Sequence, residues 1–313
     1  MKQISPERIE LASRTIDPVF LNSPQVEFDS LSEASGASVV LKIETLNPIR
    51  CFKGRGSDYF TAGLTTRAPL VLASAGNFGQ GMAYAARKRS IPVYIFAPEK
   101  ANPLKVDRMR QLGANVVLQG ADFDDSKLAA RTYATEHGYC FVEDGAEPEI
   151  AEGTGTIAVE LAREHRFDAV VAPVGNGALI NGIGCWLKSH SADTKVIGVC
   201  PANAPAMERS WRSGEITSTD AADTIADGLA VRIPVPSAVN DMRAFVDDVL
   251  LVSEEQILEA TRALFRFTGL VAEPSGVAGL AGIRSNPASF RGQRVATPIC
   301  GANVTEEQLR RWF

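Results

Sequence analysis

The feature that most constrains the fold is a regular alternation, from residue 70 onward, of short apolar runs with longer stretches whose apolar residues recur at helical spacing. Parallel strands joined by crossover helices produce this alternation, because a helix must return the chain to the edge at which the next strand starts. The first set predicts strands at 69–74, 92–98, 115–120 and 139–142, and helices at 78–90, 102–113 and 122–138.

A second set follows, with strands predicted at 168–175, 195–201 and 248–253 and helices at 153–165, 179–190, from about 204, and 254–269. Residues 37–44 alternate like a further strand, which we assign to this second set. We therefore expect an α/β fold with two lobes, each an open, mostly parallel sheet flanked by helices. The predicted domains are a large one, 1–67 and 147–313, and a small inserted one, 68–146. Residues 215–240, with small and polar residues and prolines, are predicted to form a loop over the surface or the cleft.

Composition excludes several classes of partner. The chain has 313 residues, 45% of them hydrophobic, and a formal net charge of -5, so it offers no basic surface for nucleic acid or an anionic membrane. The N-terminal segment lacks the basic start and continuous apolar run of a signal peptide, and no later apolar run reaches spanning length. We expect a cytoplasmic protein that binds neither nucleic acid nor membrane.

Cysteine and histidine usage argues against a disulfide framework, a metal site and histidine-based catalysis. An odd number of cysteines without CxxC spacing favours reduced thiols; they are Cys51, Cys140, Cys185, Cys200 and Cys300. The histidines lie near the ends of helical patterns, where a structural role is favoured; they are His137, His165 and His190. We expect no zinc.

The segment 44–60, ETLNPIRCFKGRGSDYF, places Lys53 directly after a phenylalanine and next to a glycine. An ammonium in this position is either a solvated charge at a helix start or a buried amine with chemistry to perform. The local pattern leaves both interpretations open.

Two predicted strands run into glycine-containing loops that are followed by helices. Residues 74–81 read S-A-G-N-F-G-Q-G, and residues 173–180 read P-V-G-N-G-A-L-I. Ligands bind at the carboxyl ends of strands in open α/β sheets, and the N–H groups of a helix start bind anions. Neither loop has the GxGxxG spacing of a dinucleotide site. Tight turns that use glycine only for geometry remain the alternative for each loop, and they explain the pair of loops less well.

Two anion sites and one lysine, without a catalytic histidine, indicate a cofactor with a phosphate, a substrate with a carboxylate and a Schiff-base lysine. This combination is typical of a pyridoxal phosphate enzyme that acts on an amino acid.

A series of short motifs supports this interpretation. In chain order they are K-I-E-T-L-N-P, F-K-G-R-G, S-A-G-N-F-G-Q-G, K-V-D-R-M-R-Q-L-G-A, G-A-D-F-D-D, G-T-G-T, P-V-G-N-G-A-L, A-E-P-S-G and C-G-A-N-V. With these motifs in this order, the chain resembles the threonine/serine dehydratase branch of the fold type II (tryptophan synthase β-like) pyridoxal phosphate enzymes. The likeness extends from about residue 38 to residue 304.

The resemblance implies a role for each matching position. Lys53 would be the catalytic residue that binds the cofactor as a Schiff base. The implied cofactor contacts are Phe52, Lys53, Asn77 at the pyridine 3-oxygen, Gly175, Asn176, Gly177, Ala178 and Leu179 around the phosphate, Glu273 near the ring, and Cys300 against the pyridine nitrogen. The implied contacts of the substrate, chiefly its carboxylate, are Ser74, Ala75, Gly76, Asn77 and Phe78.

Some positions depart from the family's pattern. Metal-binding members have a Glu and an Asp where this chain has Cys200 and Ala206, so we expect no divalent metal. Ala75 replaces the serine that serves racemases as an acid/base, which argues against racemisation. Phe78 replaces a histidine usual in the dehydratases, which favours a larger β-substituent. Gly54 follows the lysine where the family prefers larger residues.

The resulting hypothesis is a pyridoxal phosphate-dependent ammonia-lyase that converts a β-hydroxy L-amino acid, threonine or serine by default, to a 2-oxo acid and ammonia. One alternative keeps the cofactor and performs β-replacement, as cysteine synthases do. Another is a non-catalytic ligand-binding protein on the same fold. The resemblance also implies a homodimer.

Overall fold

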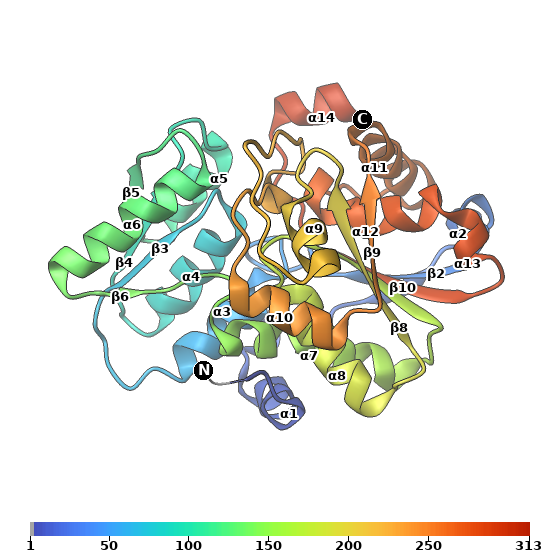
Figure 1. The fold of residues 1–313 in the computed structure, drawn as a ribbon, viewed down its shortest axis with the longest axis horizontal. Helices are drawn as coiled ribbons and strands as arrows, with labels where there is room; N and C mark the ends of the chain where they lie inside the picture. Colours follow the sequence, from blue (N-terminus) through green and yellow to red (C-terminus); the bar gives the residue numbers. More distant parts are fainter. Residues whose placement is uncertain (1–2) are drawn as a thin grey trace.

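The structure is a computed structural model that describes residues 3–313 (Figure 1). Its strands are β1 (Gln25–Glu27), β2 (Ser38–Ile43), β3 (Leu70–Ala73), β4 (Val93–Ala97), β5 (Asn115–Leu118), β6 (Cys140–Phe141), β7 (Ala169–Pro173), β8 (Lys195–Pro201), β9 (Asp248–Val252) and β10 (Arg294–Ile299). Its α-helices are α1 (Pro6–Thr15), α2 (Asp29–Ser35), α3 (Lys53–Ala62), α4 (Asn77–Lys88), α5 (Pro103–Gln111), α6 (Phe123–His137), α7 (Pro148–Glu164), α8 (Ala178–His190), α9 (Ala206–Ser213), α10 (Pro236–Phe245), α11 (Glu254–Thr268), α12 (Pro274–Ser285), α13 (Pro287–Phe290) and α14 (Glu306–Trp312), with short 3-10 helices η1 (Pro18–Phe20) and η2 (Asp227–Leu229).

The strands form two sheets. A six-stranded sheet has the order β1-β2-β10-β7-β8-β9, in which β1 pairs antiparallel with β2 and the other pairs are parallel. A four-stranded sheet has the order β5-β4-β3-β6 and is parallel throughout. Figure 1 shows this smaller sheet with α4, α5 and α6 on one side of the molecule and the larger sheet on the other. The predicted α/β class with two open, mostly parallel sheets is confirmed, while the residue boundaries of the two domains stay a prediction.

Both faces of the six-stranded sheet are buried at its centre. Alternate residues of β7 enter different apolar clusters: Val170 packs with α7 and α8, and Val171 packs with α11 and α12. A strand covered on both faces needs apolar residues at every position, which explains the continuous run AVVAP. The smaller sheet repeats this arrangement, because Leu72 of β3 packs with α4 and α5 while Val71 packs against α6.

The structure corrects some of the predicted boundaries. Residues 215–240 are not loop throughout, since α10 begins at Pro236 and η2 lies at 227–229. Proline suits the first helical position because its missing N–H has no partner there anyway. For the same reason α7 begins at Pro148, before the predicted start at residue 153. Helix α9 begins at Ala206, after Pro205 at its N-cap, rather than at about 204. Across residues 3–313, no helix is both long and apolar enough to cross a membrane.

Candidate active site

One pocket brings the predicted site residues together. It is lined by Phe52, Lys53, Ser74, Ala75, Gly76, Asn77, Phe78, Gly175, Asn176, Gly177, Ala178, Leu179, Glu273 and Cys300. These residues come from the starts of α3, α4 and α8, from the N-cap of α12 and from the end of β10. The pocket therefore lies where carboxyl ends of strands from both sheets meet helix starts, the usual ligand position in open α/β folds.

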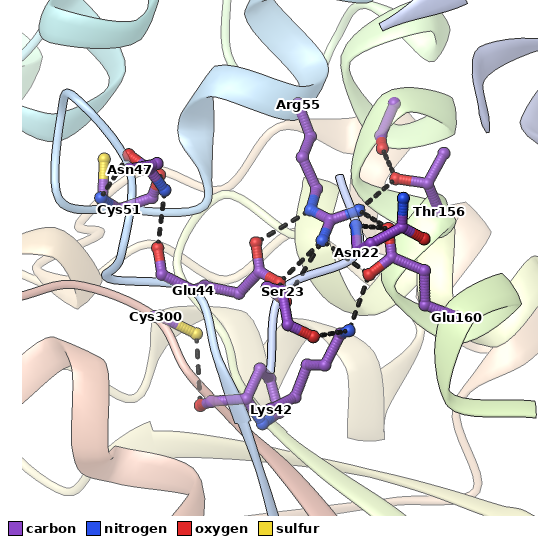
Figure 2. Close-up of polar contacts among 12 residues, drawn as sticks. Asn22, Ser23, Lys42, Glu44, Asn47, Cys51, Arg55, Thr156, Glu160 and Cys300 are labelled. Carbon is purple, nitrogen blue, oxygen red and sulfur yellow. Dashed lines mark hydrogen bonds and ion pairs between the residues drawn. The ribbon is translucent and has the colours of Figure 1, made fainter. Parts of the chain in front are cut away.

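The turn before Lys53 is fixed by the side chain of Asn47. Its Oδ1 accepts hydrogen bonds from the backbone N–H groups of Ile49 (3.1 Å) and Cys51 (3.4 Å). Its Nδ2 donates to the carbonyls of Glu44 (2.8 Å) and Cys51 (3.1 Å), and Figure 2 shows Asn47 beside Cys51. The amide thus replaces a ladder of backbone bonds and sets the direction in which the chain enters α3.

Lys53 is the first residue of α3, and its ammonium lies in the pocket. Nζ is 2.5 Å from Oδ2 of Asp144, 4.7 Å from the centre of the Phe52 ring and 5.7 Å from that of Phe78. The other oxygen of Asp144, Oδ1, is buried without a hydrogen-bond partner. A buried carboxylate oxygen without a partner is rare in proteins. The contact of Oδ2 with Lys53 is therefore the polar interaction that holds the Asp144 side chain in place.

Gly54 is explained by packing. A Cβ atom at this position would lie 2.2 Å from Cε1 of Phe20, a ring that is 3% exposed. The larger residue that the family prefers after the lysine would therefore collide with a buried side chain. The N-terminal segment of this chain occupies the space that such a residue would need.

A buried charge network lies behind the lysine. Arg55, fully buried on α3, contacts Glu44 at 2.8 Å and Glu160 of α7 at 2.6 Å, while Nζ of Lys42 on β2 is 2.6 Å from Glu160 (Figure 2). Burial opposes ionisation of Glu160, but Arg55 and Lys42 outweigh it and lower the pKa of the carboxyl to about 2. The network ties the helix that carries Lys53 to β2 and α7.

The first predicted anion loop is closed by Ser74. Its Oγ accepts hydrogen bonds from the backbone N–H groups of Gly76 at 3.0 Å and Gly79 at 2.8 Å. The N–H groups of Asn77 and Phe78, at the first positions of α4, have no partner within their own helix. The loop is thus held in a shape that presents free donors at a helix start lining the pocket, as an anion site requires.

The second loop leads from β7 into α8. Gly177, the N-cap residue, has φ +89°, a left-handed conformation that favours glycine. Oδ1 of Asn176 is buried without a hydrogen-bond partner. The N–H groups of Ala178 and Leu179 belong to the first turn of α8 and are free of intrahelical partners. A phosphate is a suitable ligand for this position because the helix start supplies both donors and a positive dipole end.

Sequence reasoning missed Lys105, Asp144 and Asp227, all of which line the pocket. Nζ of Lys105 on α5 lies 2.7 Å from Oε2 of Glu273 and 2.7 Å from Oδ2 of Asp227 in η2. Burial opposes the charge of Lys105, but the two carboxylates outweigh it and raise its pKa. The lysine lies in the quoted motif K-V-D-R-M-R, which was the one available signal; the two aspartates carried none.

Cys300 lines the pocket beside the last residue of β10. Its backbone carbonyl accepts a hydrogen bond from the N–H of Phe52 at 3.0 Å, which links β10 to the start of α3. Burial raises the pKa of the Cys300 thiol well above the usual range of cysteine. The group therefore faces the pocket as a neutral thiol.

The histidines lie outside this pocket. His137 and His190 end α6 and α8, and His165 follows the last residue of α7, which confirms their predicted places at helix ends. Among residues 3–313, no group of three or more His, Cys, Asp or Glu side chains could hold a metal ion.

Comparisons with known proteins agree with the geometry of the pocket. Residues 16–301 match the family model described as pyridoxal-phosphate dependent enzyme. The L-threonine ammonia-lyase of Thermotoga maritima is 35% identical over 312 residues, which are 98% of this chain and 78% of that protein. The processed form of threonine deaminase isoform 2 from Solanum lycopersicum has a TM-score of 0.89 at 27% identity, covering 99% of this chain and 89% of that one. Maize serine racemase has a TM-score of 0.90 at 23% identity, covering 99% of this chain and 97% of that one, a likeness of fold alone.

Proposed function

The chain belongs to the family of pyridoxal-phosphate dependent enzymes, and from this premise we propose that it is an ammonia-lyase acting on L-threonine or L-serine. The β-hydroxyl leaves as water, one water is consumed again on hydrolysis, and the net products are a 2-oxo acid and ammonia. The observation that carries the proposal is a single pocket lined by Lys53 and by two helix starts that suit two different anions. The likeness to the L-threonine ammonia-lyase of Thermotoga maritima supports the choice of substrate.

The residues present fit the cofactor. Lys53 would bind its aldehyde, residues 175–179 would hold its phosphate, and Asn77 would donate to its 3-oxygen. The left-handed Gly177 and the helix start that follows it support the phosphate assignment. When bound, the cofactor supplies an electron sink for the bond that breaks at the Cα atom of the amino acid.

The substrate carboxylate fits the loop at residues 74–78. The N–H groups at the start of α4 would bind it, and Ser74 would keep the loop in shape. This contact fixes the amino acid by its invariant end and leaves the β-substituent facing other pocket residues. Phe78 and Phe123 line that same pocket and give it an apolar part.

Lys53 is the proposed general base at Cα, since its Nζ lies in the pocket 5.7 Å from the centre of the Phe78 ring, which belongs to the proposed carboxylate loop. Asp144, at 2.5 Å, would steady the ammonium that forms when Nζ takes up the proton. Ala75 offers no acid or base on the other side, which supports elimination rather than racemisation. A neutral thiol at Cys300 stabilises positive charge on a ring nitrogen less than a carboxylate would, which also favours loss of a β-substituent.

The test combines a cofactor measurement with product analysis. The purified protein with pyridoxal phosphate is expected to be yellow, and borohydride should fix the cofactor to the Lys53 peptide. K53A should remain colourless, while K195A, which changes a lysine 66% exposed on β8, should behave like the wild type. A wild-type protein that gains no visible band would defeat every enzymatic assignment and leave the ligand-binding alternative.

Products distinguish elimination from β-replacement. L-threonine, L-serine and O-acetylserine are each supplied with and without a thiol, and 2-oxo acid, ammonia and thioether are measured. We expect 2-oxo acid and ammonia from threonine or serine regardless of thiol. Thioether without 2-oxo acid would replace this proposal by β-replacement.

We further propose that residues 68–146 move as a small domain against residues 1–67 and 147–313, and that the protein is a cytoplasmic homodimer. The separate four-stranded sheet supports the division, and the cysteines without a disulfide partner suit a reducing compartment. Light scattering on a sizing column tests the dimer, and fractionation of the source cells tests the location.

A further inference from the structure

Lys105 joins parts of the pocket that come from different sheets. It lies on α5, beside the four-stranded sheet, and its side chain is 3% exposed. Its ammonium bridges Glu273, at the N-cap of α12, and Asp227 in η2. The methylene chain of the lysine passes Gly76, where a Cβ atom would lie 2.3 Å from its Cδ. The Lys105 side chain therefore contacts three parts of the pocket: the loop at residues 74–78, the 3-10 helix η2 and Glu273.

Glu273 contacts both Lys105 and Asn77. The Oε1 atom of Glu273 accepts a hydrogen bond from Nδ2 of Asn77 at 2.5 Å, while its Oε2 faces Lys105 at 2.7 Å. An ionised carboxylate only accepts hydrogen bonds, so it selects the amino side of the Asn77 amide. Burial raises the pKa of Glu273, and Lys105 opposes this rise. Without Lys105, the carboxylate would lose the cation that opposes burial, and burial would favour its protonated form.

The oxygen side of the same amide is held independently. Oδ1 of Asn77 accepts a hydrogen bond from Nδ2 of Asn303 at 2.8 Å, and that Nδ2 also donates to the carbonyl of Ile49 at 3.0 Å. Asn77 thus has an acceptor on its nitrogen and a donor on its oxygen, and one hydrogen of Nδ2 remains for a ligand in the pocket.

We propose that Lys105 is a positioning residue that acts through Glu273 to hold the Asn77 amide as a hydrogen-bond donor to the 3-oxygen of pyridoxal phosphate. The inference rests on the proposed function, because it needs that cofactor in the pocket. In this proposal a residue of α5, beside the four-stranded sheet, helps to orient the cofactor. Because Asp227 pairs with the same ammonium, the position of η2 would also affect that orientation.

The decisive experiment is a double-mutant cycle of K105M and E273Q, read by the dissociation constant of pyridoxal phosphate and by its visible absorbance maximum when bound. K105M leaves a buried carboxylate uncompensated, so we expect about tenfold weaker binding and a shifted maximum. The neutral amide that E273Q introduces can accept from Asn77 without needing a cation, so K105M should cost little in the E273Q background. K105R, which keeps the charge, should resemble the wild type.

Controls separate this role from a purely structural one. K127M removes a lysine of α6 that pairs with Asp124 and Glu143 outside the pocket, and it should leave the cofactor spectrum unchanged. Thermal unfolding of the cofactor-free proteins shows which variants fold. If K105M folds only together with E273Q, the double variant should bind pyridoxal phosphate with the affinity and absorbance maximum of E273Q alone.

Three results would overturn it: wild-type affinity and absorbance in K105M, an equal cost of K105M in both backgrounds, or failure of both K105M proteins to fold. Failure of the proposed function looks different, because the wild type itself would then bind no pyridoxal phosphate.

Discussion

Nη1 of Arg55 lies 2.6 Å from Oε1 of Glu160, and this contact joins α3 to α7 in the interior of the protein (Figure 2). Arg55 also contacts Glu44 on its other side, so one guanidinium is shared by two buried carboxylates. Because α3 begins with Lys53, two residues before Arg55, the network fixes the helix end from which the proposed catalytic amine extends. Buried pairs of this kind are costly to break on one side only.

E160Q should therefore lower the free energy of unfolding in a pH-dependent way. Arg55 and Lys42 hold the pKa of Glu160 at about 2 against the effect of burial. The ionised carboxyl therefore contributes fully to the free energy of unfolding above the usual pKa of a glutamate, and this contribution is lost as the pH falls towards 2. At pH 7 we expect E160Q to be less stable by on the order of 3 kcal/mol. Urea unfolding at pH 7, 5, 4 and 3 measures the difference, which should narrow as the pH falls.

E306Q is the matched control, since Glu306 pairs with Arg310 on α14 with its side chain 87% exposed. An exposed pair contributes little, so this variant should match the wild type at every pH. A stability loss in E160Q that stayed constant from pH 7 to pH 3 would mean that the network acts by shape rather than by charge.

G177A should weaken cofactor binding more than it weakens the fold. The residue has φ +89°, and its new Cβ would lie 3.1 Å from Cβ of Ala238, so the loop at the start of α8 must shift. We expect at least about tenfold weaker binding of pyridoxal phosphate, measured by titration of its visible band. G269A is the control, because Gly269 has φ +71° at the end of α11 with nothing within 4 Å of its Cβ. It should lose stability and keep its affinity; equal losses of affinity would refute the phosphate assignment.

Local patterns were sufficient for the parts of the site that lie at strand ends. The pocket contains both predicted loops and Lys53, because glycine-containing turns between a strand and a helix have a local signature. Their roles stay predictions until the cofactor is seen on the protein. The order of the strands in the larger sheet differs from their order in the chain, because β10 lies between β2 and β7. Local patterns carry no information about this order.

The residues that were missed depend on long-range contacts. Asp144 follows the last strand of the smaller sheet and Asp227 lies in an irregular segment, yet each forms an ion pair with a pocket lysine far away in sequence. Such partners have no periodicity to reveal them. Helix α10 was missed for a different reason: Pro236 was interpreted as a breaker, although proline is favoured at the first helical position.

S74A should impair substrate binding. The change removes the acceptor of the Gly76 and Gly79 N–H groups, so the loop loses the bonds that keep it in shape. We expect KM for threonine to rise about tenfold with a smaller change in kcat, measured by release of 2-oxo acid. S126A also removes a fully buried serine, whose Oγ bonds to Gln119 and Asp122 away from the pocket. An equal rise of KM in S126A would assign the effect to general loosening.

F78H should change which amino acid is preferred. The Phe78 ring is 5% exposed, lines the pocket and lies 5.7 Å from Nζ of Lys53, so the β-substituent of the substrate meets an apolar surface. Apolar contacts of this size discriminate by about 1–3 kcal/mol, so the ratio of kcat/KM for 3-phenylserine to that for serine should fall about tenfold or more in F78H. F265H changes a phenylalanine 45% exposed on α11 and should leave the ratio unchanged. A ratio that stays constant in F78H would show that the β-substituent points away from this ring, and the search for the specificity residue would then turn to Phe123.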